Sequence, residues 1–150
     1  MKKTMKKTIL VSALLLMIGI SGTFAADGVS DKIMNSFKKE FTNAQDVDWQ
    51  IGKEYVKATF NINGQVMFAY YSDNGNQLGI ARNMISTNLP LSLNRELKYY
   101  LSQSWITELF EINSSGQTSF YVTVENADYN MVLKSTDLNG WEVYSKRHKD

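Results

Sequence analysis

The chain has no cysteine, one proline and one histidine among its 150 residues. Without cysteine it has no disulfide, no thiolate ligand for a metal and no thiol nucleophile. The single histidine, His148, lies next to the C-terminus, beyond the last predicted strand. A Ser-His-Asp triad needs a histidine held in a cleft beside the other two groups, so this position argues against one. Stability must come from burial of apolar side chains.

The carboxylates of the chain are not spaced for catalysis or for metal binding. Glu108 and Glu111 are the nearest candidate pair, but on a strand a spacing of three places them on opposite faces. The segment 73–76 resembles the start of a calcium loop, yet it lacks the later bidentate glutamate, and a hairpin turn explains it. We therefore predict a protein that is not an enzyme, with no catalytic residues, no metal site and no cofactor.

The N-terminus has the pattern of a secretory signal peptide. Four lysines in the first seven residues precede an apolar stretch at 9–20, and small residues follow at 21–25. We predict a signal peptide over 1–25, cut between Ala25 and Ala26. The alternative is a membrane anchor, but the stretch is shorter than the ~20 residues that cross a bilayer. We expect a periplasmic protein with no membrane attachment after cleavage.

Removal of the signal peptide would change the charge of the chain. The full sequence has 16 basic and 15 acidic residues, for a formal net charge of +1. Loss of the four leader lysines leaves 12 basic against 15 acidic residues, a net charge of −3. A mildly acidic domain lacks the basic surface that nucleic acid requires, so we expect no nucleic-acid partner. The basic cluster at 146–149 is predicted to be a solvent-exposed tail.

One pattern occurs twice along the chain. Three apolar residues spaced four apart are followed eight residues later by a tryptophan: Ile33, Phe37, Phe41 and Trp49, then Leu89, Leu93, Leu97 and Trp105. The apolar spacing is typical of one face of a helix, and we interpret both tryptophans as core anchors. An Asp-initiated turn follows each tryptophan, at Asp73 and Asp137. A single insertion between Trp105 and Gly116, as a longer strand and turn, accounts for the different offsets and favours an internal duplication.

The pattern predicts the fold class. We expect one domain at 26–150, made of two repeats at about 29–86 and 88–146, each a helix followed by strands. The predicted strands cover 47–51, 54–62, 65–72 and 77–85, then 105–112, 118–125, 129–136 and 141–146. The expected architecture is α+β: a tandem duplication of a helix plus a four-stranded antiparallel sheet. Both helices would pack on one face of a shared curved sheet and leave the other face open.

Several segments, taken in order, resemble the PepSY-like, β-lactamase-inhibitor-like family of secreted bacterial proteins. They are FKKEFTNA at 37–44, VDW at 47–49, YVKATF at 55–60, FAYYSDNG at 68–75 and the segment 89–100. The resemblance implies tandem helix-plus-four-strand units, a periplasmic setting and a protein-binding or inhibitory role. Thr42 departs from the family, which often has proline there, and this should only loosen the helix exit. No residue that matches the family indicates which target this chain would bind.

The turn Asn63-Gly64 predicts a two-residue hairpin that fixes the register of its strands. Lys57 would then pair with Tyr70 and Thr59 with Phe68, all on the open face. An aromatic stripe flanked by a lysine is typical of a binding surface. The alternative is a bulge at the turn, which would shift the register and place Phe68 and Tyr70 in the core.

In the second repeat, Tyr121, Lys134 and Tyr144 would extend this surface. We predict a monomeric, non-catalytic periplasmic module that binds a protein or peptide of the cell envelope through the open face. Inhibition of an enzyme is one form that such binding takes. The alternative is a carrier of a small apolar or envelope-derived ligand, held between the sheet and the helices.

Overall fold

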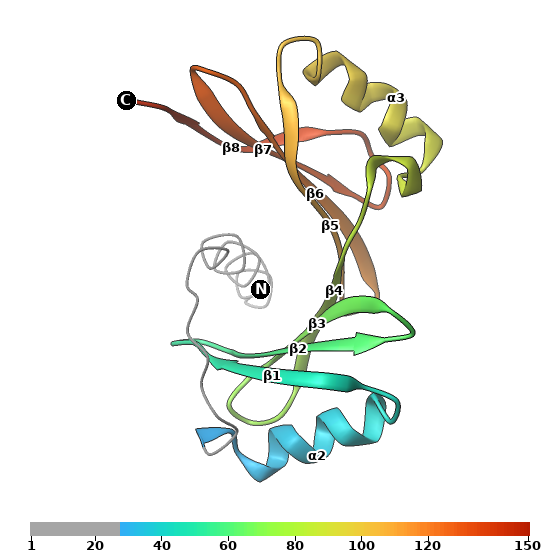
Figure 1. The fold of residues 1–150 in the computed structure, drawn as a ribbon, viewed down its shortest axis with the longest axis vertical. Coiled ribbons are helices and arrows are strands. Elements are labelled where there is room, and N and C mark those ends of the chain that lie inside the picture. Colours follow the sequence, from blue (N-terminus) through green and yellow to red (C-terminus); the bar gives the residue numbers. More distant parts are fainter. Residues whose placement is uncertain (1–27) are drawn as a thin grey trace, which may run out of the picture.

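The computed structural model describes residues 28–150, so the signal peptide expected at 1–25 lies outside the described residues. Eight antiparallel strands form one sheet in which each strand pairs with its neighbour in the sequence (Figure 1). No helix in residues 28–150 has the length and apolar character required to cross a membrane. The elements are α2 (Asp31–Glu40), β1 (Gln45–Ile51), β2 (Val56–Ile62), β3 (Gln65–Tyr71), β4 (Gln77–Asn83), the 3₁₀ turn η2 (Ser86–Asn88), α3 (Leu91–Tyr100), β5 (Trp105–Ser114), β6 (Gln117–Glu125), β7 (Tyr129–Thr136) and β8 (Glu142–His148).

Helix α2 begins where the sequence predicts. The Ser30 hydroxyl accepts a hydrogen bond from the Ile33 backbone N–H at 3.5 Å, which caps the helix. Asp31 in the first turn and lysines in the last turn complement the helix dipole. Ile33 and Phe37 are buried against strands β1 to β3. The Phe37 ring meets the Trp49 ring edge-on, with centroids 5.1 Å apart.

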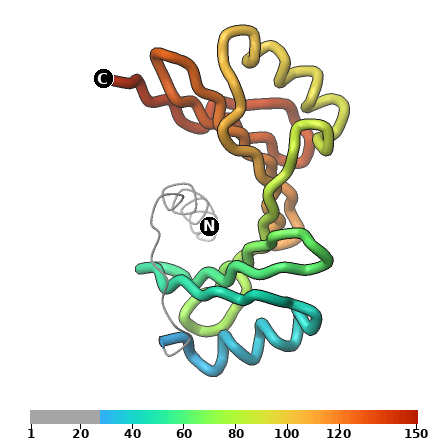
Figure 2. The backbone as a smooth tube through the Cα atoms, in the orientation of Figure 1, coloured from blue at the N-terminus to red at the C-terminus, as the bar shows by residue number. Residues whose placement is uncertain are grey.

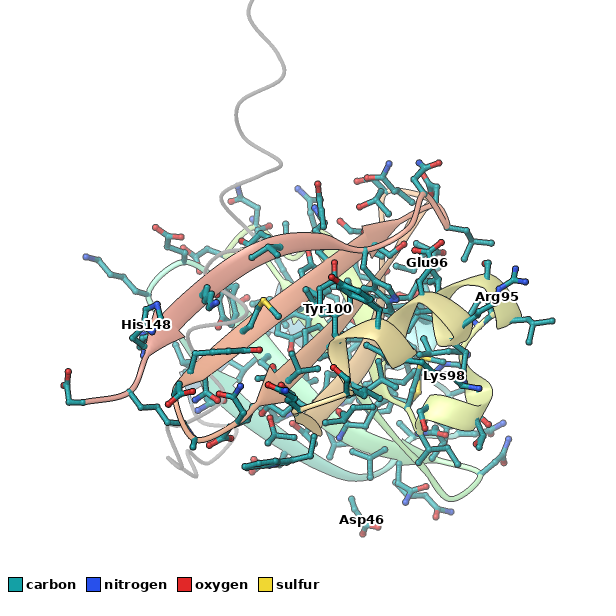
Figure 3. The ribbon with its side chains drawn as sticks, turned by 90° about the horizontal axis from the view of Figure 1, so that it is seen from above. Asp46, Arg95, Glu96, Lys98, Tyr100 and His148 are labelled. Atoms are coloured by element: carbon teal, nitrogen blue, oxygen red, sulfur yellow. The ribbon has the colours of Figure 1, made fainter. Side chains whose placement is uncertain are left out.

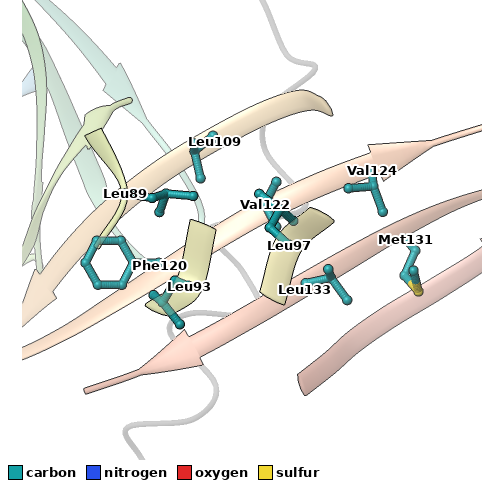
Figure 4. Close-up of a cluster of buried hydrophobic side chains, with 9 residues drawn as sticks. All are labelled: Leu89, Leu93, Leu97, Leu109, Phe120, Val122, Val124, Met131 and Leu133. Carbon is teal, nitrogen blue, oxygen red and sulfur yellow. The ribbon is translucent and has the colours of Figure 1, made fainter. Parts of the chain in front are cut away.

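Helix α3 follows the only proline of the chain. Pro90 occupies the N-cap position, where a missing N–H has little cost. The Asn94 side-chain amide donates to the Ser86 carbonyl at 2.6 Å and ties the helix to the η2 turn. Leu93 and Leu97 are buried under the helix (Figure 4). They share one apolar cluster with side chains from β5, β6 and β7: Leu109, Phe120, Val122, Val124, Met131 and Leu133.

The fold class expected from the sequence is wrong. The chain is mainly one continuous eight-stranded sheet, and it is not a tandem of two helix-plus-four-strand units with a helical layer on one face. The strands assigned to separate repeats are joined directly, because β4 pairs with β5 from Ile80–Asn113 to Asn83–Phe110. The two helices have ten residues each; α2 packs on β1 to β3 and α3 packs on β5 to β7. Local apolar spacing predicts single helices and strands and carries no information on whether they assemble as separate units under a helical layer, and that is why the expectation failed.

The two tryptophans of the repeated pattern are not equivalent. Trp49 is 5% exposed and belongs to the cluster under α2, so its predicted role as a core anchor is confirmed. Trp105 is 56% exposed, and its predicted role is wrong. The next residue, Ile106, packs on the α3 cluster instead, since neighbours on a strand point to opposite faces. The longer strand expected after Trp105 is present, because β5 has 10 residues and β1 has 7.

The C-terminal basic cluster is exposed, as expected, but it is not a tail. Lys146, Arg147 and His148 belong to the edge strand β8, where Arg147 pairs with Asn130 and His148 with Tyr129. Charged side chains along an edge strand oppose pairing with another chain. The last strand is therefore longer than predicted, and its charged side chains oppose edge-to-edge association with another chain.

Candidate binding surface on the inner face of the sheet

The sheet bends into an arc with α2 at one end and α3 at the other (Figures 1 and 2). We call the concave side of this arc the inner face. Side chains on a strand alternate between the two faces, so those that contact the helices are excluded from it. In β2 the buried residues Ala58 and Phe60 contact the α2 cluster, which leaves Lys57 and Thr59 on the inner face.

The predicted register of the β2–β3 hairpin is confirmed. Lys57 pairs with Tyr70 and Thr59 with Phe68. Both turn residues, Asn63 and Gly64, have positive φ angles of 52° and 81°, as a two-residue hairpin turn requires. The β2–β3 register has no shift, so the alternative with a bulge at this turn is wrong. Phe68 and Tyr70 are therefore on the inner face.

The inner face carries one continuous apolar cluster, which we call the inner-face cluster. The cluster crosses the middle of the sheet through directly paired residues: Phe68 pairs with Ala81, and Ala81 pairs with Ile112. The pairing of β4 with β5 therefore joins aromatic residues from both ends of the chain. The cluster has five buried and five half-buried members: Tyr55, Tyr70, Ala81, Ile112 and Tyr121, with Phe68, Leu78, Phe110, Val132 and Tyr144.

Ring contacts fix the second half of this cluster. The Phe110 and Tyr121 rings stack with centroids 5.1 Å apart and an interplanar angle of 12°. The Tyr144 ring meets Tyr121 edge-on at 5.7 Å. The Lys134 ammonium lies 5.8 Å from the Tyr121 centroid and 5.9 Å from that of Tyr144. These three predicted site residues, Tyr121, Lys134 and Tyr144, thus form one contact group.

The first half also has a lysine over an aromatic ring. The Lys57 ammonium lies 4.7 Å from the Phe68 ring centroid, within the range of a cation–π contact. The Tyr70 ring meets Tyr55 edge-on at 5.5 Å. Thr59 lies beside them, paired with Phe68 on one side and Asp48 on the other. The structure brings Lys57, Thr59 and Phe68 together and places Tyr70 beneath them in the cluster.

Burial separates the predicted site residues into two levels. The exposure expected of Tyr70 and Tyr121 on the open face is wrong, because Tyr121 is fully buried and Tyr70 nearly so, whereas Phe68, Lys134 and Tyr144 are half-buried. Burial raises the pKa of the Tyr70 and Tyr121 hydroxyls above the ordinary tyrosine value. Burial also lowers the pKa of Lys57, and the nearby Asp48 carboxylate opposes this shift. The two tyrosines form the floor of the surface, and the lysines and the other rings form its contact layer.

Sequence reasoning missed several members of this surface. Tyr55 was placed by alternation on the same face as Lys57 and Thr59 but was not included in the predicted surface, although it is buried in the inner-face cluster. Phe110 and Ile112 are two residues apart in β5, and this spacing predicts that both side chains lie on the same face of the strand. That signal could not be connected to Phe68 without knowledge of the β4–β5 pairing.

Glu108 and Glu111 do not form a second site. Glu108 accepts a hydrogen bond from the Thr123 hydroxyl at 3.3 Å, and Glu111 forms an ion pair with Arg82 at 3.1 Å. Their different partners agree with the predicted placement on opposite faces. Within residues 28–150, no three His, Asp or Glu side chains lie close enough together to hold a metal ion. His148 is exposed at the end of β8, where it pairs with Tyr129, and Figure 3 labels it on the opposite side of the view from Arg95 and Lys98 of α3.

Comparison with known proteins identifies the fold and no family. No family model matches the sequence, and no curated protein matches it. A DUF2874 family protein from Bacteroides ovatus ATCC 8483 has a TM-score of 0.69 and 16% identity over 79% of this chain and 86% of that chain. A protein assigned to the periplasm of Bacteroides eggerthii DSM 20697 has a TM-score of 0.71 and 14% identity over 80% and 88%.

A BLIP-like protein from Bacteroides fragilis NCTC 9343 has a TM-score of 0.63 and 19% identity over 79% of this chain and 85% of that chain. The chain therefore has a BLIP-like fold, and at these identities the likeness extends to the fold alone. The β-lactamase-inhibitor-like part of the resemblance is consistent with this fold. Nothing in the comparisons supports the PepSY-like part.

Proposed function

We propose that the protein is a monomeric, non-catalytic module of the periplasm that binds a protein or peptide through the inner face of its sheet. The observation that carries the proposal is the inner-face cluster, which joins both halves of the arc and has a lysine over at least one aromatic ring in each half. The fold shared with a BLIP-like protein and with a protein assigned to the periplasm supports such a module. Its partner would be a component of the cell envelope.

The composition of the surface supports recognition of another chain. Aromatic side chains give large contact areas at a small entropic cost, and they are enriched at the centres of protein interfaces. Here the Tyr121 and Phe110 rings are held by stacking, so the surface is ordered before a partner arrives. Lys57 and Lys134 each keep N–H groups that can donate to carbonyl or carboxylate oxygens of a partner.

The carrier alternative has weaker support. It requires space for a ligand between a helix and the sheet. A hollow of about 420 Å³ lies beside α2, lined by Met34, Phe37, Lys38, Phe41, Thr42, Ala44, Val47 and Trp49. The core beneath each helix is otherwise filled by buried side chains. Leu93 and Leu97 under α3 are 0% and 1% exposed, and Ile33 under α2 is 1% exposed. The inner face is the better candidate for binding.

The proposal is tested by quantitative affinity capture from envelope extract with the mature chain, residues 26–150. Two inner-face variants, Phe68→Ser and Lys134→Glu, are compared with Leu91→Ser, which alters an apolar residue that is 82% exposed on α3. We expect one captured protein to be lost with both inner-face variants and retained with Leu91→Ser. Equal capture by all three folded variants would overturn the proposal.

A further inference from the structure

A second hollow lies on another part of the molecule, where α3 ends and β5 begins. Its volume is about 440 Å³, within the range of small-ligand sites. It is formed by the last two residues of α3, the loop that follows and the start of β7. The lining residues are Tyr99, Tyr100, Ser102, Gln103, Ser104 and Tyr129. None of them belongs to the inner-face cluster.

Three tyrosine rings shape this hollow. Tyr100 is half-buried at the C-terminal end of α3 and packs on the α3 cluster (Figure 3). The Tyr99 ring stands perpendicular to it, with centroids 5.6 Å apart. Tyr99 is itself 82% exposed, so it presents a large aromatic surface to solvent. Two rings at right angles form a corner that an apolar face of a ligand can enter.

The third ring is fixed from two sides. The Tyr129 hydroxyl and the Ser104 hydroxyl lie 3.4 Å apart and share a hydrogen bond. The Lys146 ammonium lies 4.1 Å from the Tyr129 ring centroid, which directs its charge to the π face. Tyr129 is therefore a stable wall of the hollow and is not a freely rotating side chain.

The lining groups define the chemistry of a ligand. All six side chains are uncharged, and five of them carry a hydroxyl while Gln103 carries an amide. A charged ligand would lose hydration without gaining an ion pair from these residues. The complementary ligand is uncharged, carries many hydroxyl groups and has apolar C–H faces that pack on aromatic rings. Sugar rings combine these three properties.

We propose that this hollow is a binding site for a neutral oligosaccharide. Tyr99 and Tyr100 would pack against the C–H faces of a sugar ring. Ser102, Gln103 and Ser104 would exchange hydrogen bonds with its hydroxyls. The Ser102 hydroxyl donates to the Tyr99 carbonyl at 3.3 Å, and it keeps lone pairs that accept from a ligand. This site is separate from the inner face, so the two proposals stand or fall independently.

The test is a titration of the ¹⁵N-labelled mature chain with maltopentaose, cellopentaose and chitotetraose, followed by amide chemical shifts. We expect saturable shifts at residues 99–104 and at Tyr129 with at least one sugar. Tyr99→Ala and Gln103→Ala should each weaken that affinity at least tenfold. Leu91→Ala, at an equally exposed position of the same helix, should leave it unchanged.

Three outcomes would overturn the proposal. The first is the absence of shifts with all three sugars at millimolar concentration, where even weak specific binding is visible. The second is equal affinity of Tyr99→Ala and the unaltered chain. The third is saturable shifts at 99–104 with an uncharged Gly-Ser-Tyr-Ser peptide and none with the sugars, which would make the hollow a peptide site.

Discussion

The indole N–H of Trp141 donates a hydrogen bond to the backbone carbonyl of Leu93, 2.9 Å away. The two residues are 48 positions apart in the sequence, and the bond ties the segment before β8 to helix α3. Leu93 carries its own side chain into the apolar cluster under α3, and Trp141 packs against the same cluster, so the hydrogen bond and the packing together anchor the helix over the sheet. Trp141, and not Trp105, is the tryptophan that secures this end of the molecule.

Replacement of Trp141 by Phe removes this hydrogen bond and part of the packed surface. We expect the free energy of unfolding to fall by about 1–3 kcal/mol, because the loss combines a hydrogen bond with apolar burial. Urea unfolding checks this. The matched control is Trp105→Phe, at a position that is 56% exposed, where the change should stay within ~0.5 kcal/mol. An equal effect of the two substitutions would contradict the assignment.

The Tyr121 hydroxyl is buried and has no hydrogen-bond partner among the described residues. Leaving a buried polar group unpaired costs about 1–3 kcal/mol, so its removal should not destabilise the fold. We expect Tyr121→Phe to leave the free energy of unfolding unchanged or raise it by up to about 1 kcal/mol. Tyr129→Phe, which loses the Ser104 contact, should lower it. A clear loss of stability in Tyr121→Phe would show that the hydroxyl has a partner.

The turn between β3 and β4 packs on α2 through Gly75. Its φ angle is +81°, and a Cβ atom there would lie 3.1 Å from the Lys32 backbone carbon. The Ser36 hydroxyl also donates to the Gly75 carbonyl at 2.9 Å. We expect Gly75→Ala to destabilise the protein by about 2–3 kcal/mol, from backbone strain and the clash together. Gly64→Ala separates the two causes, because its φ is also +81° and nothing lies within 4 Å. Urea unfolding of both variants should show a smaller loss of unfolding free energy for Gly64→Ala than for Gly75→Ala.

Burial raises the pKa of Tyr71 to about 12, from an ordinary value of 10.0. Between these values the unfolded chain loses the tyrosine proton while the folded chain keeps it, so the folded state binds more protons. Stability should therefore fall as pH rises through this window. Urea midpoints measured across it should decrease, and less steeply in Tyr71→Phe. Tyr70 and Tyr121 shift in the same direction, so some decrease should remain. A midpoint independent of pH would contradict the burial of these hydroxyls.

Burial lowers the pKa of Lys57, and this shift makes stability rise with pH, opposite to the effect of the buried tyrosines. Below the ordinary lysine value of 10.5, the unfolded chain keeps a proton that the folded chain has begun to lose, so stability rises with pH. Lys57→Met should remove this rise. The difference in urea midpoint between Lys57→Met and the unaltered chain should narrow as pH approaches that value. A constant difference would place Lys57 in solvent.

Local chemistry in the sequence was sufficient for local structure. Asn63-Gly64 gave the register of β2 and β3, and Ser30 gave the start of α2. Both depend on a few neighbouring residues whose backbone preferences are strong. The same reasoning placed Lys57, Thr59, Phe68 and Tyr70 on one face before their contacts were known.

Long-range pairing was beyond the reach of the sequence pattern. No short turn connects β4 to β5, because η2 and α3 lie between them, so turn chemistry could not indicate that Ala81 meets Ile112. The exposed state of Trp105 follows from which face Ile106 takes, and a register shift between Ile106 and Glu108 affects that part of β5. The depth of Tyr121 depends on rings from β5 and β8 that stack on it, and only the assembled sheet brings these together.

The order of the strands has a consequence for how the chain reaches its native state. Six of the seven connections between neighbouring strands of the sheet are short, so pairing can close them locally. The exception is the step from β4 to β5, whose partners Asn83 and Phe110 are 27 residues apart and Ile80 and Asn113 are 33 apart. Closing that loop carries the largest entropic cost of any adjacent pairing in the sheet. Each end has its own apolar cluster under a helix, so the ends can order first and the middle last. The inner-face cluster would then be the final part of the molecule to become complete.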